Sequence, residues 1–83
     1  MQPANEPPRI PDYDKRLSRT ERGRIRSAIH KIQGVNHKVL SMNLISDGVA
    51  EVHCGGGRSL TIFVVKRADD VWVVDSYETS TFA

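Results

Sequence analysis

The residue types with the most chemical potential lie in one short segment that contains Glu51, His53 and Cys54. A carboxylate, an imidazole and a thiol could bind a metal ion, or form a nucleophile with its base. Side chains alternate between the two faces of a strand, so Glu51 and His53 would share one face and Cys54 the other. Because Cys54 would point away from His53, it lacks a neighbouring base or metal ligand, and a small buried residue is its expected role. We therefore predict a non-enzymatic protein with no catalytic residue, no metal ligand and no bound cofactor.

Three glycines, residues 55–57, follow this segment and precede Arg58. Glycine backbone N–H groups can hold an anion, but a phosphate loop needs a longer spacing and ends in Lys followed by Ser or Thr. The run is more typical of a flexible connection between strands. Arg58, together with these N–H groups, is kept as a candidate anion contact.

A second group of candidate residues is basic and lies around a predicted helix. Arg19, Arg22 and Arg26 fall on one flank of that helix, within an arc of roughly 80°. Such a flank could bind the phosphates of a nucleic acid or an acidic protein partner. It could equally be a solvated surface, because none of the five aromatic residues lies on the helix. The candidate contacts are Lys15, Arg16, Arg19, Arg22, Arg26 and Arg58.

The composition predicts one small cytoplasmic domain with an uneven charge distribution. The chain has 83 residues and one cysteine, so no disulfide can form within it. It has no apolar stretch of about 20 residues and no apolar run behind a basic start, which argues against a membrane span and a signal peptide. Residues 1–38 carry nine Lys/Arg and four Asp/Glu, whereas residues 39–83 carry three and six. This asymmetry could reflect an anionic partner, or equally charge complementarity inside the domain or within a dimer.

The elements that would position these residues begin after a proline-rich segment. All four prolines lie within residues 1–17, which predicts a disordered tail followed by a single domain over residues 18–83. Ser18 and Glu21 have the spacing of a capping box, and Gly34 is the predicted end of the helix. The apolar stripe of the helix consists of Ile25, Ala28, Ile29 and Ile32.

Four apolar runs follow the helix, so the sequence predicts an α+β domain: one helix packed on four antiparallel strands. In the first predicted hairpin, a loop with Gly48 in a left-handed conformation keeps one face apolar. That loop places Leu44 opposite Ala50, Met42 opposite Val52 and Leu40 opposite Cys54.

In the second predicted hairpin, Lys66 pairs with Trp72. This pairing places Leu60, Ile62, Val64, Trp72 and Val74 toward the helix. Both faces of the hairpin are then apolar, and a single helix can cover only one of them. We therefore predict a homodimer formed through the open face, whose residues in this register are Phe63, Val65, Val71, Val73 and Tyr77.

The end of the chain resembles the closing hairpin of the nuclear-transport-factor-2-like proteins, within the cystatin-like arrangement. An apolar strand, residues 60–65, is followed by Asp69, Asp70 and Val71, then by Trp72 and an apolar pair. The resemblance covers residues 18–78. It implies a curved sheet wrapped on one helix, with dimerisation through the free face of the sheet.

Overall fold

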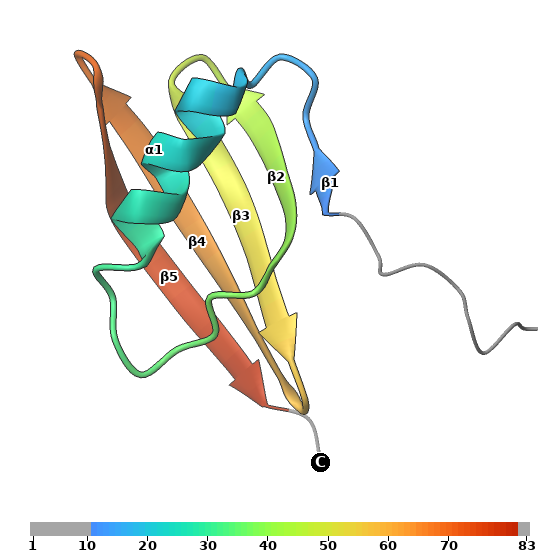
Figure 1. Cartoon of the computed structure of the whole chain (residues 1–83). Coiled ribbons are helices and arrows are strands. Elements are labelled where there is room, and N and C mark those ends of the chain that lie inside the picture. The colour runs from blue at the N-terminus through green and yellow to red at the C-terminus, as the bar shows by residue number, and fades with distance from the viewer. Residues whose placement is uncertain (1–10, 82–83) are drawn as a thin grey trace, which may run out of the picture.

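One helix crosses one face of a five-stranded sheet in the computed structural model, which describes residues 11–81 of the chain (Figure 1). The sheet has the order β1-β2-β3-β4-β5. The α+β class is confirmed, but the predicted four-stranded antiparallel sheet lacked β1, which pairs in parallel with β2. The bounds are β1 Asp12–Tyr13, α1 Arg19–Ile29, β2 Val39–Ser46, β3 Val49–Gly56, β4 Ser59–Ala68 and β5 Val71–Thr81.

The helix α1 begins as predicted, with both hydrogen bonds of the capping box between Ser18 and Glu21. Ile25 and Ile29 are fully buried against the sheet, which confirms the apolar stripe. The helix ends at Ile29, earlier than predicted, and His30 caps it by donating its N–H to the carbonyl groups of Arg26 and Ala28. Gly34 has φ +79° in the loop that follows, so it forms a turn and does not cap the helix.

The folded domain begins earlier than residue 18. Tyr13 pairs with Met42, and Leu17 is only 2% exposed in the core. Asp14 accepts hydrogen bonds from the side chain of Arg16 at 2.8 Å and from the backbone N–H of Leu44 at 3.0 Å. These contacts hold the pKa of Asp14 well below its usual range. The predicted tail is thus wrong for residues 12–17, while residues 1–10 lie outside the described part.

The β2–β3 hairpin has most of the predicted register. Leu44 lies opposite Ala50 and Met42 opposite Val52, and Gly48 has φ +72°. The third predicted pair is wrong, because an irregularity at Leu40 places Val39 opposite Cys54. Leu40 is 40% exposed, since the extra residue turns its side chain away from the core.

The β4–β5 hairpin differs from the prediction by one residue. Asp69 takes φ +59°, which allows a two-residue turn and pairs Arg67, not Lys66, with Trp72. A one-residue slip exchanges the two faces of a strand. Phe63 and Val65, expected on the open face, are therefore fully buried under α1. Trp72 is 5% exposed in the same core, as predicted.

Candidate functional site

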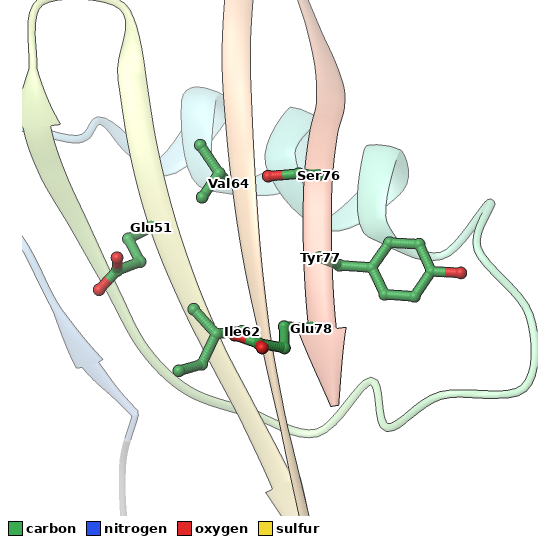
Figure 2. Close-up of a pocket in the computed structure, with 6 residues that line it drawn as sticks. All are labelled: Glu51, Ile62, Val64, Ser76, Tyr77 and Glu78. Atoms are coloured by element: carbon green, nitrogen blue, oxygen red, sulfur yellow. The ribbon is translucent and has the colours of Figure 1, made fainter. Parts of the chain in front are cut away.

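The open face of the sheet carries an aliphatic stripe with polar side chains on both sides of it. Ile62 and Val64 of β4 lie on the side of the sheet away from α1 (Figure 2). Their neighbours are His53 and Glu51 on β3, and Glu78 and Ser76 on β5. Five of these six residues, all except His53, line a shallow hollow, and Tyr77 completes its lining.

Beside the hollow, the Nε2 atom of His53 lies within hydrogen-bond distance, 2.8 Å, of the Oε1 atom of Glu51, which lines it. The sequence placed these two residues on one face, and the register, which sets them opposite Asn43 and Ser41, confirms it. Within residues 11–81, no group of three His, Cys, Asp or Glu residues is arranged to hold a metal ion.

The five residues predicted as a dimer interface do not form one surface. Phe63 and Val65 are buried in the core, whereas Val71 and Val73 are 59% and 48% exposed on the open face. Tyr77 lies opposite Phe63 on the helix side, with the two ring centroids 5.8 Å apart. The apolar residues that do share the open face are Leu60, Ile62, Val64, Val49, Val71 and Val73.

A second surface combines the basic flank of α1 with an aromatic ring. The guanidinium carbon of Arg22 lies 4.6 Å from the ring centre of Tyr13, and that of Arg26 lies 5.4 Å away. Both distances are within the range of a cation–π interaction. We call Tyr13, Lys15, Arg19, Arg22 and Arg26 the basic flank. In the described residues, none of its four cations is in an ion pair.

The other two predicted contacts, Arg16 and Arg58, are not part of the basic flank. Arg16 binds Asp14 and also donates to the carbonyl oxygen of Leu44 at 3.1 Å. Arg58 lies in the turn between β3 and β4. The first turn of α1 lies at the other end of the sheet, where Glu21 contacts Arg67 at 3.0 Å. The proposed glycine anion site is therefore separate from the basic flank.

Cys54 is buried and cannot readily act as a nucleophile. Its side chain belongs to the core between α1 and the sheet, while His53 points to the opposite face. Burial raises the pKa of the Cys54 thiol to about 11. At neutral pH the group is a thiol, which agrees with the predicted role as a small apolar residue.

Tyr13 is the functional candidate that sequence reasoning missed. It lies in a proline-rich segment, and the parallel pairing of β1 with β2 brings it beside Arg22 and Arg26. The available signal was an aromatic residue five positions before the helix cap Ser18. That spacing alone does not specify where the ring packs.

In residues 11–81, the helix is neither long nor apolar enough to cross a membrane. No protein-family model, no curated protein and no solved structure matches this chain.

Proposed function

We propose that this protein is a non-enzymatic interaction module that forms a homodimer through the open face of its sheet. The observation that supports it is the aliphatic stripe of Ile62 and Val64 together with the residues on its two sides. Ile62 and Val64 are both half-buried in the monomer, and an apolar stripe that stays accessible within a polar rim is typical of a protein interface.

Two pairings across the open face are complementary between copies. Consider two copies packed face to face, with a two-fold axis running along β4 between them, so that β3 of one copy lies over β5 of the other. One row, with Ile62 at its centre, then sets His53 opposite Glu78 of the second copy. A second row, Val49–Lys66–Val73, sets Val49 opposite Val73 of the second copy, and the two Lys66 side chains face each other across the axis, each paired with Asp75 of its own copy at 3.4 Å. The first row matches an imidazole with a carboxylate, and the second matches a valine with a valine.

A homodimer of this kind would be weak. Burial of apolar surface contributes about 25 cal/mol per Å². The loss of translational and rotational freedom costs roughly 4–15 kcal/mol. The stripe occupies mainly one strand and its neighbours, so the apolar area that a dimer would bury is small. We therefore expect a dissociation constant of the homodimer in the micromolar range.

The first test is the substitution Val64→Asp, which places a charge in the middle of the stripe. We expect the wild type to change from monomer to dimer between low micromolar and millimolar concentration, and the variant to remain a monomer. Sedimentation velocity over that range measures both. The matched control is Thr20→Asp, because Thr20 is exposed on α1 and the same charge there should leave the dimer intact. A wild type that stays monomeric at millimolar concentration would contradict the proposal.

We propose nucleic-acid binding through the basic flank as a second candidate function. The specific observation that favours it is Tyr13 beside Arg22 and Arg26, since single-strand binders combine cations with an aromatic ring on which a base can stack. Lys15 and Arg19 extend the positive charge toward the start of α1. Phosphate contacts of this type position a strand without reading its sequence.

The test of this second function is fluorescence anisotropy with labelled single-stranded RNA and DNA oligonucleotides at two salt concentrations. We expect binding to weaken as salt rises, and Arg26→Glu to lower the slope of log affinity against log salt by about one. The control is Arg24→Glu, which reverses a charge on the other flank of the same helix. An affinity independent of salt, or equal loss in both variants, would exclude a phosphate contact at the basic flank.

A further inference from the structure

A groove runs between α1 and the first half of β5, on the side of the helix away from the basic flank. It consists of two adjoining hollows of about 270 Å³ and 160 Å³. Both hollows are lined by Ala28, Lys31 and Trp72. Arg24 stands at one end of the groove and Ile32 and Val74 at the other, so the floor is apolar and one wall is basic.

The strand that borders this groove is an open edge of the sheet. β5 pairs with β4 from Val71 to Thr81, and in residues 11–81 no strand pairs with its other side. Before the irregularity near Asp75, its first half, residues 71–74, contains no charged residue and no proline, which are among the features that protect an edge from pairing. At the opposite edge, β1 pairs with β2 over two residues, Asp12 and Tyr13. Figure 1 shows β5 at one side of the sheet, with α1 passing over it.

The charges at the groove indicate what would occupy it. Arg24 and Lys31 take part in none of the ion pairs of the described residues. Asp70 is the one acidic residue among those that line the two hollows. A ligand that brings carboxylates to the helix wall would neutralise two unpaired cations.

We propose that this groove binds an extended acidic peptide segment of another protein. The segment would pair with the free edge of β5 as an additional strand, and an apolar side chain would pack on Ala28 and Trp72. Its carboxylates would lie against Arg24 and Lys31. Recognition of this type takes affinity from backbone hydrogen bonds and specificity from alternate side chains.

A second copy of this chain fits the groove less well. If β5 of another copy paired with the same edge, the two sheets would form one continuous sheet with both helices on the same side. Glu78 points to the open face, where it lies beside Ile62, and Asp75 is paired with Lys66 at 3.4 Å. Neither carboxylate of that strand would reach the helix wall, so the charge complementarity favours a different protein.

The experiment is selection from a phage-displayed library of random dodecapeptides on the full-length protein. We expect the enriched peptides to contain an excess of Asp and Glu alternating with apolar residues. A labelled synthetic copy of an enriched peptide should bind the wild type, and Arg24→Glu combined with Lys31→Glu should weaken it by about tenfold or more. Lys38→Glu, which reverses an exposed charge outside both the groove and the basic flank, is the control and should leave that affinity unchanged.

NMR amide shifts on adding the same peptide then locate the site. We expect the largest shifts at residues 71–74 and along α1 from residue 24 to residue 31. A selection without enrichment, enriched peptides without an acidic excess, or shifts centred on Ile62 and Val64 would each overturn the proposal. Far-UV circular dichroism of the double variant verifies that any loss of binding occurs in a folded protein.

Discussion

Replacing Trp72 with alanine is expected to unfold the protein or to leave it without fixed side-chain packing. Trp72 is 5% exposed and belongs to the single core between α1 and the sheet. Truncation of a buried tryptophan or phenylalanine costs about 3–5 kcal/mol. A domain with so few ordered residues has little more than about 5 kcal/mol of total stability. The loss should therefore remove most of the native population.

Urea unfolding followed by circular dichroism measures this effect, with near-UV spectra to report side-chain packing. The matched control is Val71→Ala, because Val71 is adjacent in β5 and 59% exposed on the other face. We expect the control to unfold close to the wild type. A Trp72→Ala variant whose free energy of unfolding falls by less than about 1 kcal/mol would show that the ring is not part of the core.

The parts of the fold that could be predicted are those whose local sequence pattern fits only one structure. The capping box of Ser18 and Glu21 specifies a helix start within four residues, and Ile25 and Ile29 specify its buried side. In the first hairpin, apolar and polar residues alternate over residues 40–44 and again over residues 50–54, so only one register of the turn places Met42 and Val52 together on an apolar face. Local chemistry and burial agree in these elements.

The β4–β5 hairpin could not be predicted because its pattern supports two registers equally well. β4 is apolar on both faces between Leu60 and Val65, so a slip of one residue leaves an apolar face toward the helix in either case. The structure selects one register through the positive φ of Asp69. Left-handed backbone is rare for residues other than glycine, although Asp and Asn adopt it more often. An irregularity near Asp75 then shifts the remainder of the strand.

The candidate surfaces depend on contacts between distant segments, which periodicity does not reveal. Tyr13 reaches Arg22 and Arg26 because β1 lies beside β2, which comes after the helix in sequence. The groove between α1 and β5 likewise joins Arg24 with Trp72 across the domain. The sequence did identify Arg22 and Arg26 as candidate contacts, but not Arg24, and it placed Glu51 and His53 on one face. What it lacked was the aromatic or apolar partner of each cation.

The corrected register leads to a second large effect, at Phe63. The pairing of Lys66 with Trp72 would place Phe63 on the open face, where truncation would weaken association and leave the monomer stable. In the structure Phe63 is fully buried, lies opposite Tyr77, and is the largest fully buried side chain of the described residues. Phe63→Ala should therefore destabilise the monomer itself by about 3–5 kcal/mol.

The comparison with Ile62→Ala separates the two registers, because Ile62 is the neighbour of Phe63 and points to the other face of the sheet. Ile62 is only half-buried in the monomer, so its truncation should lower the free energy of unfolding much less than that of Phe63. Urea titrations at a concentration below self-association measure both variants as monomers. The reverse order, with Ile62→Ala the more destabilising, would mean that β4 presents its other face to α1. The open stripe would then consist of Phe63 and Val65, and the pairing of His53 with Glu78 of a second copy would be lost.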